Sequence, residues 1–398
     1  MKKCYTYDDV NIIPKYSELG SRSDIDLKTN FTKKTKLQIP IVSSPMDTVT
    51  ELDMALEMME WGGVGVIHRF NSIEEQSSMM KKIHKKFESY FEISKDRPQT
   101  IEEARKEYYK TNEYGDDDWP NQTGNLEAYL DIVKHRLDTD KLWRKRPMCA
   151  AIGVTGDYLE RAKELVKNGC NVLLIDVAHG HHKLVGEAIE EIKKNIQGVE
   201  VVAGSVATAS ATKYLCESGA DAIRVGIGNG SLCETRIRTG VGIPQVTALL
   251  DCVAVADTFG CPTIADGGVR TIGDVCKGLA CRADSVMLGS LLSGTKESPG
   301  EIEKVGKWPN EQLFKKYRGS ASLDSKKSRG DKKNVEGNHK VIPYKGKLHR
   351  ILHDIKDGIC SSFSYVGANN MVEYHSKVEL IEVTRAGNIE GKPHLLDN

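Results

Sequence analysis

The apolar residues of this chain gather into short, nearly continuous runs separated by amphipathic stretches. After residue 148 the runs are MCAAIGV, VLLIDVA, VEVVAGSVA, DAIRVGIG, CPTIADGG and DSVMLGS, and helical patterns such as DYLERAKELVKNG separate them. Parallel strands that are buried on both faces lose the alternation of polar and apolar residues. The pattern therefore predicts repeated βα units around a parallel sheet.

Two further apolar runs come early in the chain. IPIVSSPMDTV (39–49) and VGVIH (64–68) flank the helical stretch ELDMALEMMEWGG. With them the number of βα units approaches eight, so we predict an α/β fold, a (β/α)8 TIM barrel. The alternative is a doubly wound open sheet, but the GxGxxG turn that follows the first strand in nucleotide-binding sheets of that kind is missing.

The segment between about residues 71 and 146 breaks this alternation. It is charged and mostly helical in pattern, and the acidic loop NEYGDDDWPNQ interrupts it. We predict that residues 1–83 form the first part of the barrel, 84–146 a helical insertion or subdomain, and 147–398 the remainder of the barrel with an active-site loop, a flap and a C-terminal segment. Asp116, Asp117 and Asp118 fit a solvated loop better than a metal site, because three consecutive carboxylates do not all face one ion.

Polar residues follow the apolar runs with unusual regularity. Asp176 follows VLLI, Ser205 follows VEVVA, and Asp266 follows PTIA. The carboxyl ends of barrel strands converge on one mouth, so these residues are expected to share a site. A nucleoside monophosphate fits them: Asp266 can accept hydrogen bonds from ribose hydroxyls, and a phosphate can be held by amides and a hydroxyl at helix starts. The candidates for the phosphate are Gly267, Gly268, Gly289 and Ser290.

The stretch 223–245, IRVGIGNGSLCETRIRTGVGIPQ, places one cysteine in a glycine-rich loop after a strand. Glycines allow the backbone to turn carbonyls and amides toward a ligand. Cys233 is a candidate nucleophile, since Arg236 could favour its thiolate and Thr235 is close enough to hydrogen-bond the reacting centre. The alternative is a small buried cysteine without a chemical role.

Composition limits the classes of function. The 56 basic and 56 acidic residues cancel, so no overall field attracts nucleic acid or an anionic membrane. Ten cysteines without CxxC or Cys/His spacing suggest neither zinc nor disulfides, and together with the absence of a signal peptide or membrane-length apolar run they predict a cytoplasmic protein. His179, His181 and His182 lie on a strand-to-helix turn that would splay them, so we interpret them as solvated rather than metal-binding.

The loop sequences G-I-G-N-G-S-L-C-E-T-R and T-G-V-G-I-P-Q resemble the catalytic loop of the IMP dehydrogenase and GMP reductase family. The runs SSPMDTV, GVGVIH, VTGDYLERA, VMLGSLLSGTKESPGE, YRG and IPYKGKL are also similar to that family. The resemblance covers about 1–80 and 147–398. Many IMP dehydrogenases carry a pair of regulatory nucleotide-binding modules where this chain has its shorter helical segment.

The resemblance implies roles for individual residues. Cys233 would attack C2 of a purine nucleotide, and the backbone of Gly228, Gly230 and Cys233 would hold a monovalent cation such as K⁺. Asp176 would lie on the nicotinamide side of an NAD cofactor, together with Ser205, where relatives often have asparagine. A homotetramer is common in the family. The substrate contacts implied or expected are Ser44, Met46, Gly230, Ser231, Asp266, Gly267, Gly268, Gly289, Ser290, Tyr317 and Glu336.

The flap leaves the direction of the reaction open. The dehydrogenase flap carries an Arg-Tyr pair that activates water, whereas here Arg329 is followed by Gly330. GMP reductases use a glutamate after a Gly-Met-Ser-Ser run, where this chain has Leu323 and Asp324. Most other runs favour an NAD-dependent dehydrogenase that converts IMP to XMP, with Arg329 as a catalytic candidate. The alternatives are an NADPH-dependent GMP reductase, which SYVGA favours, and a purine nucleotide-binding relative without catalysis.

Glu234, which stands between Cys233 and Thr235, has two interpretations. Its carboxylate could act as an unusual acid or base. The interpretation that we favour is an exposed loop carboxylate without a part in catalysis.

Overall fold

A computed structural model describes residues 1–95, 98, 100–106, 130, 146–306, 310–319 and 339–391. Eight strands form a closed barrel in the order β10-β11-β4-β5-β6-β7-β8-β9, and every neighbouring pair is parallel. The predicted (β/α)8 barrel is therefore confirmed. The strands are β4 (Ile41–Ser43), β5 (Val64–Ile67), β6 (Cys149–Ile152), β7 (Val172–Ile175), β8 (Glu200–Val206), β9 (Ala222–Val225), β10 (Thr263–Asp266) and β11 (Ser285–Leu288).

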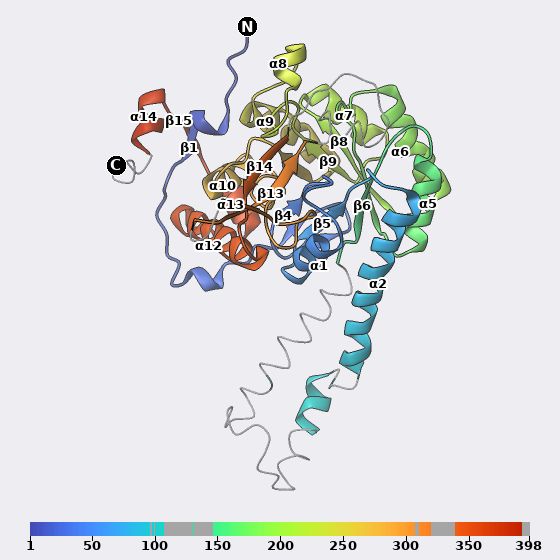
Figure 1. Cartoon of the computed structure of the whole chain (residues 1–398). Helices are drawn as coiled ribbons and strands as arrows, with labels where there is room; N and C mark the ends of the chain where they lie inside the picture. The colour runs from blue at the N-terminus through green and yellow to red at the C-terminus, as the bar shows by residue number, and fades with distance from the viewer. Residues whose placement is uncertain are drawn as a thin grey trace.

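Helices follow the strands and surround the barrel (Figure 1). They are α1 (Leu52–Glu60), α2 (Ile73–Lys95), α5 (Tyr158–Lys167), α6 (Lys183–Asn195), α7 (Ala209–Glu217), α8 (Thr235–Thr239), α9 (Gln245–Ala256), α10 (Ile272–Ala280) and α12 (Leu348–Val366). Helix α2 extends well beyond the barrel, and residue 84 lies inside it (Figure 1). Most of the predicted 84–146 insertion lies outside the described residues.

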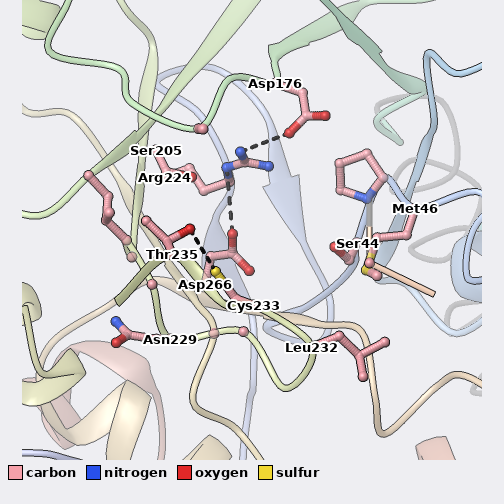
Figure 2. A pocket seen from close by; sticks show the side chains of 18 of the residues that line it. Ser44, Met46, Asp176, Ser205, Arg224, Asn229, Leu232, Cys233, Thr235 and Asp266 are labelled. Atoms are coloured by element: carbon pink, nitrogen blue, oxygen red, sulfur yellow. Dashed lines mark hydrogen bonds and ion pairs between the residues drawn. The ribbon is translucent and has the colours of Figure 1, made fainter. Parts of the chain in front are cut away.

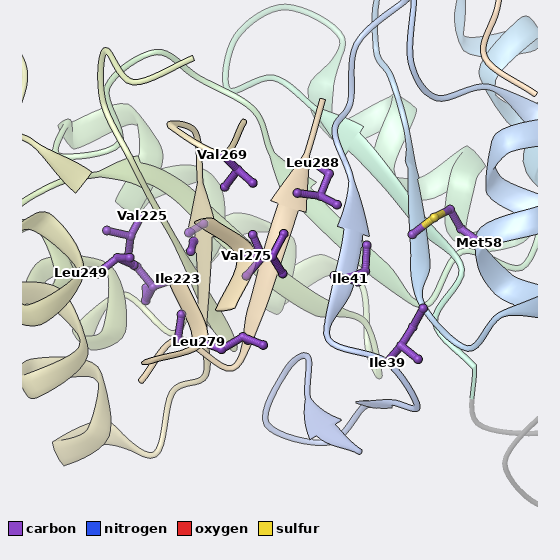
Figure 3. Packing of buried hydrophobic residues seen from close by; sticks show 14 of the residues in the cluster. Ile39, Ile41, Met58, Ile223, Val225, Leu249, Val269, Val275, Leu279 and Leu288 are labelled. Atoms are coloured by element: carbon purple, nitrogen blue, oxygen red, sulfur yellow. The ribbon is translucent and has the colours of Figure 1, made fainter. Parts of the chain in front are cut away.

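Alternate residues of each strand belong to two different cores. In β7, Val172 and Leu174 belong to the cluster that fills the barrel, whereas Leu173 packs outward in the cluster shared with the helices. Figure 3 shows part of this outer cluster. Phe31 and Leu37, from the hairpin of β2 (Thr29–Asn30) and β3 (Lys36–Leu37), join the inner cluster. A continuous apolar run in the sequence thus serves two cores at once.

A small antiparallel sheet follows the last barrel strand. It consists of β12 (Glu303–Val305), β13 (Gln312–Arg318) and β14 (His339–Pro343). Lys315 is buried in β13, and its Nζ donates hydrogen bonds to the carbonyls of Thr295 at 3.0 Å and Ser298 at 2.5 Å. Burial lowers the pKa of this ammonium group, while acidic groups nearby oppose that effect. The contacts anchor β13 to the loop that follows β11.

A two-stranded sheet outside the barrel joins an early and a late segment of the chain. Strand β1 (Val10–Ile12) pairs antiparallel with β15 (Leu380–Glu382), and Figure 1 shows both on the same side of the molecule. The remaining elements are the 3-10 helices η1 (Tyr7–Asp9), η2 (Arg22–Asp24) and η3 (Asp257–Phe259) and the helices α13 (Met371–Lys377) and α14 (Arg385–Glu390). Within the part of the chain that the structure describes, no helix is both long and apolar enough to span a bilayer.

Candidate active site

A cavity of about 430 Å³ opens at the carboxyl ends of the barrel strands (Figure 2). Its volume is in the range of small-molecule sites. The cavity brings together residues that the sequence predicted from separate strand ends, and Cys233 lies in its wall. The predicted residues that line it are Ser44, Met46, Asp176, Ser205, Gly228, Gly230, Ser231, Cys233, Thr235, Asp266, Gly267 and Tyr317.

The two-residue period of the strands explains why charged side chains enter the cavity. Leu174 points into the barrel, so Asp176, two positions later, faces the same way at the strand end. Ile264 and Asp266 stand in the same relation on β10, and so do Ala222 and Arg224 on β9. The residues that fill the barrel below therefore set the direction of the functional side chains above.

The loop between β9 and α9 carries Cys233. It begins at Gly226, whose φ is +150° and where an added Cβ would lie only 1.8 Å from the Asp266 carbonyl oxygen, so a side chain is excluded there. The Cys233 amide donates to the Gly230 carbonyl at 3.0 Å, which forms a turn. This turn places Cys233 Sγ 3.1 Å from Thr235 Oγ1, at the start of the five-residue helix α8. The thiol and the hydroxyl thus face the cavity as a pair (Figure 2).

The charged residues next to the cysteine brace the loop. Arg236 donates hydrogen bonds to the Asn229 side chain and to the Ile243 carbonyl, and burial lowers its pKa, against an opposing contribution from Cys233. Glu234 Oε2 accepts a hydrogen bond from Arg238 Nε at 2.6 Å and is not among the residues that line the cavity. Glu234, whose side chain is only 23% exposed, therefore pairs with Arg238 rather than facing the cavity, which favours the interpretation without a part in catalysis.

A buried guanidinium joins the two carboxylates of the site (Figure 2). Arg224 Nη2 donates to Asp176 Oδ1 at 2.9 Å, and Arg224 Nε lies 3.7 Å from Asp266 Oδ2. Burial lowers the pKa of Arg224, but Asp176 and Asp266 outweigh it and the net shift is upward. Burial raises the pKa of Asp266, although Arg224 opposes this. The sequence analysis missed Arg224, for which the available signal was a charged residue inside the apolar run DAIRV.

Further lining residues missed in the sequence come from the end of β5. Arg69 and Phe70 follow the apolar run VGVIH and form one wall of the cavity. His68 is buried beneath them: its Nδ1 accepts a hydrogen bond from the Phe70 amide, and its Nε2 lies 3.1 Å from Glu51 Oε1. His68 Nε2 therefore carries the ring proton and donates a hydrogen bond to Glu51.

The opposite wall contains Tyr317 from β13. Its hydroxyl lies 3.0 Å from Ser231 Oγ in the catalytic loop, and burial raises the pKa of the tyrosine. Arg318, next in the strand, pairs with Asp47 at 2.7 Å and so fixes β13 against the loop after β4. A side chain at Gly289 would come within 3.2 Å of Tyr317 Oη.

The other predicted phosphate residues lie beside the cavity. Gly268 donates its amide to the Asn229 carbonyl at 2.8 Å, and Ser290 Oγ donates to the Val269 carbonyl at 3.5 Å. Gly268, Gly289 and Ser290 therefore adjoin the cavity without lining it.

Comparison with known proteins gives this geometry a family. The profile described as "IMP dehydrogenase / GMP reductase domain" matches residues 4–394, nearly the whole chain. The chain belongs to the IMP dehydrogenase / GMP reductase family. It is an oxidoreductase, and its family in general uses a nicotinamide cofactor.

Individual relatives of this family member match over nearly their full length. The inosine-5'-monophosphate dehydrogenase of Cryptosporidium parvum is 39% identical over 98% of this chain and 95% of that protein. The corresponding enzyme of Nitrosopumilus maritimus is 36% identical over 99% and 98%. A crystal structure of a Trypanosoma brucei GMP reductase variant in complex with guanosine 5'-monophosphate superposes with a TM-score of 0.83, at 29% identity over 99% of this chain and 98% of that one.

Several residues considered in the sequence of this IMP dehydrogenase / GMP reductase family member lie either outside the described residues or away from the cavity. Arg329 and Glu336 lie outside the described residues, as do Asp116, Asp117 and Asp118. His182 Nδ1 accepts a hydrogen bond from the Leu184 amide and so caps α6, while the His181 ring lies 5.5 Å from that of Tyr214. Among the residues that the structure describes, no group of three or more His, Cys, Asp or Glu side chains could hold a metal ion.

Proposed function

We propose that this protein oxidises IMP to XMP with NAD, through a covalent intermediate on Cys233. The observation that carries the proposal is the pairing of Cys233 Sγ with Thr235 Oγ1 at 3.1 Å, inside a cavity whose far wall holds Asp176 and Arg224. A site that only bound nucleotide would need no nucleophile. Proteins named as inosine-5'-monophosphate dehydrogenases, 36–39% identical over nearly the whole chain, further support this direction of the reaction.

We propose that the nucleotide binds in the part of the cavity formed by the loops after β9 and β10 and by Tyr317 of β13, next to the loop after β11. Asp266 would accept hydrogen bonds from the ribose hydroxyls when ionised. Tyr317 and Ser231, which hold each other at 3.0 Å, would turn their hydroxyls to the phosphate. The further contacts proposed are Gly267, Gly268, Gly289 and Ser290 for the phosphate, and Ser44, Met46, Gly230 and Glu336 for the remainder of the nucleotide.

The proposed reaction has two stages. The thiolate of Cys233 adds to C2 of IMP, and a hydride then leaves C2, which regenerates a carbon–nitrogen double bond. Thr235 hydrogen-bonds the reacting centre, and Arg329 is the candidate that activates water for the second stage. Water adds to C2, the carbon–sulfur bond breaks, and the thiolate is released with XMP. The balance is IMP, NAD⁺ and water to XMP, NADH and a proton.

The cofactor and a cation complete the proposal. The residues proposed for NAD are Asp176 and Ser205, which line the cavity across from Cys233, and NAD when bound accepts the hydride. The cavity lies between Cys233 on one side and Asp176 and Ser205 on the other. Arg224 also lines it, and its Nε is buried without a hydrogen-bond acceptor among the described atoms. K⁺ would be held by the backbone oxygens of Gly228, Gly230 and Cys233, which are neutral hard donors of the kind such ions accept. Gly230 O already accepts the Cys233 amide, which leaves it one lone pair.

A second candidate function is GMP reductase, which removes ammonia from GMP and delivers hydride from NADPH. The observation that favours it is the superposition on a GMP reductase with GMP bound, at a TM-score of 0.83 over 98% of that chain. The flap sequence supports neither enzyme fully, because Arg329 is followed by Gly330.

Absorbance at 340 nm decides between the two. The purified chain is mixed with IMP and NAD, or with GMP and NADPH, each in potassium and in lithium buffer. We expect a rise in the first mixture, XMP as the product by chromatography, and a weaker rate in lithium. A fall in the second mixture alone would identify a reductase. Silence in both, with nucleotide still bound, would identify a binding protein without turnover.

The organisation of the protein is proposed on separate grounds. We infer a cytoplasmic homotetramer in which the 84–146 segment, predicted to be helical, makes contacts beyond its own barrel, either as a lid or with a neighbouring subunit. The length by which α2 exceeds the barrel supports a contact of this kind (Figure 1). Light scattering on the full chain and on a chain with this segment shortened tests the proposal, because a monomer in both cases would contradict it.

A further inference from the structure

Arg69 reaches across the mouth of the barrel from the end of β5. Its guanidinium carbon lies 5.2 Å from the centre of the Phe70 ring, which supports the side chain from below. The side chain passes over the end of β6 at Gly153, where an added Cβ would lie 3.5 Å from Arg69 Nη1. The guanidinium thus passes close to the end of β6 on its way to the Asp176 carbonyl at the end of β7.

The contacts of Arg69 use only one of its nitrogens. Nε donates to the Asp176 carbonyl at 3.2 Å and lies 3.7 Å from Asp176 Oδ2. Among the described residues, neither Nη1 nor Nη2 has a hydrogen-bond acceptor. The side chain is 33% exposed and lies in the cavity wall, so these nitrogens are available to a ligand.

The charges of the cavity distinguish Arg69 from its neighbour Arg224. These two are the positively charged residues that line the cavity within the described part of the chain. Arg224 is buried between Asp176 and Asp266, at 2.9 and 3.7 Å, whereas Arg69 shares only Asp176, at 3.7 Å, and is the more exposed of the two. An anionic group that enters beside Asp176 would therefore meet Arg69.

The covalent structure of a nicotinamide dinucleotide supplies such a group. Its diphosphate is esterified to the 5' oxygen of the nicotinamide ribose, so a ribose held at Asp176 places the diphosphate only a few bonds further along the cavity wall. Arginine is suited to two phosphate oxygens at once, since its paired N–H groups form two charge-assisted hydrogen bonds. The phosphate of the substrate is a poorer match, because its proposed residues lie on β10, β11 and β13, whereas Arg69 lies beside β5, β6 and β7.

We infer that Arg69 binds the diphosphate of the dinucleotide cofactor through Nη1 and Nη2, while its Nε holds Asp176 in position for the ribose. This inference rests on the proposed function for its cofactor class. It holds equally for NAD and NADP, which share the diphosphate.

Equilibrium binding tests the inference independently of turnover. Titration calorimetry compares wild type, Arg69→Ala and Arg69→Lys with NAD, with nicotinamide mononucleotide, and with nicotinamide riboside, which lacks phosphate. We expect Arg69→Ala to weaken NAD binding by roughly ten- to a hundredfold, the loss of two charge-assisted hydrogen bonds. The affinity of Arg69→Ala for the riboside should stay within about twofold of wild type. The affinity of Arg69→Lys for NAD should lie between those of wild type and Arg69→Ala, since the lysine ammonium group is a point charge and lacks the paired N–H groups of arginine.

The controls separate a direct contact with the diphosphate from an indirect effect on the site. Lys356→Ala, which removes one exposed positive charge from α12, should leave all three affinities unchanged. An equal loss for NAD and for the riboside would show that Arg69 acts only through Asp176, and would overturn the inference. So would unchanged NAD binding in Arg69→Ala. If wild type binds no dinucleotide at all, the proposed function fails and the inference fails with it. If wild type binds NAD and Arg69→Ala binds it equally well, only the inference fails.

Discussion

The two ends of the barrel both contain buried polar groups but use them differently. At the amino ends of the strands the buried acids are satisfied by the protein: Glu200 accepts hydrogen bonds from the Lys34 amide at 2.9 Å and the Thr35 hydroxyl at 2.6 Å. Asp284 accepts from the Thr263 amide at 2.8 Å. At the carboxyl ends the same barrel leads to Asp176, Arg224 and Asp266 around a cavity of about 430 Å³.

The difference lies in what covers the polar groups. Phe31 and Leu37 fill the barrel at the closed end, so the acids there meet only backbone and neighbouring side chains. At the open end Arg69 Nη1 and Nη2 have no acceptor among the described residues, and the Arg69 side chain is 33% exposed in the cavity wall. A buried polar group that is fully paired contributes to folding, whereas an unpaired group exposed in a cavity wall is available to a ligand. The closed end should therefore control stability and the open end chemistry.

Cys233→Ala is expected to give the largest effect, and it should act on chemistry alone. Loss of the nucleophile should lower the rate of IMP oxidation by on the order of a thousandfold or more. The free energy of unfolding should change by less than about 1 kcal/mol, because Cys233 is not fully buried. Steady-state assays and urea denaturation measure the two quantities. Cys4→Ala, at an exposed cysteine, is the matched control, and an unchanged rate in Cys233→Ala would contradict the covalent mechanism.

Phe31→Ala should lower stability and leave the chemistry of the active site unchanged. The ring is fully buried in the barrel interior, so its removal leaves a cavity and should lower the free energy of unfolding by about 3–5 kcal/mol. The KM values of the folded variant should remain within about twofold of wild type, because Phe31 is not among the residues that line the active site. Urea denaturation and kinetics below the unfolding transition test this. A large rise in the KM for nucleotide would show that the two ends are coupled.

Asp284→Asn probes the closed end through pH. Burial raises the pKa of Asp284 from 3.8 to about 6, against smaller opposing hydrogen bonds. The folded state thus binds this proton more tightly than the unfolded state. Protonation of Asp284 therefore stabilises the folded state fully below pH 3.8, and this contribution is lost as the pH rises through 6. The loss amounts to about 3 kcal/mol at most.

An asparagine at this position can still accept the Thr263 amide but does not titrate. We therefore expect the free energy of unfolding of Asp284→Asn to rise relative to wild type between pH 4 and pH 7. Urea denaturation at several pH values gives both curves. Parallel curves would show that Asp284 is not the group responsible.

Tyr317→Phe should have the smallest effect, confined to the open end. Removing the hydroxyl breaks the contact with Ser231 and the proposed contact with phosphate, so the KM for nucleotide should rise by about three- to tenfold. The KM for NAD should be unchanged. Tyr365→Phe, at a tyrosine that is 62% exposed on α12, is the matched control. An equal rise in both KM values would place Tyr317 outside the nucleotide half of the site.

The sequence predicted the barrel and much of its mouth for a definite physical reason. Apolar runs of strand length alternate with helical patterns, and an acid that directly ends such a run, like Asp176 or Asp266, lies at the strand's carboxyl end. The family resemblance then supplied Tyr317, which comes from a strand outside the barrel. Neither the apolar pattern nor the family resemblance required knowledge of the direction in which a long side chain extends from its strand.

The residues that were missed depend on those paths. Arg224 was included in an apolar strand, although a charge inside a buried run indicates a partner that is also buried. Arg69 extends from the end of β5 past Gly153 to the Asp176 carbonyl, and nothing in the order of residues reveals that path. Glu234 is adjacent to Cys233 in sequence, but the short helix α8 pairs it with Arg238, four residues later. Arg329 and Glu336 remain predictions.

The pairing of β1 with β15 has a consequence for synthesis on the ribosome. Glu382, the partner of Val10, is synthesised 372 residues after it. At roughly 5–20 residues per second, the first strand waits about 20 to 75 s before its partner is made. During that interval its backbone amides and carbonyls are open to any other extended segment. The nascent chain therefore carries an unpaired strand edge until Glu382 has left the ribosome.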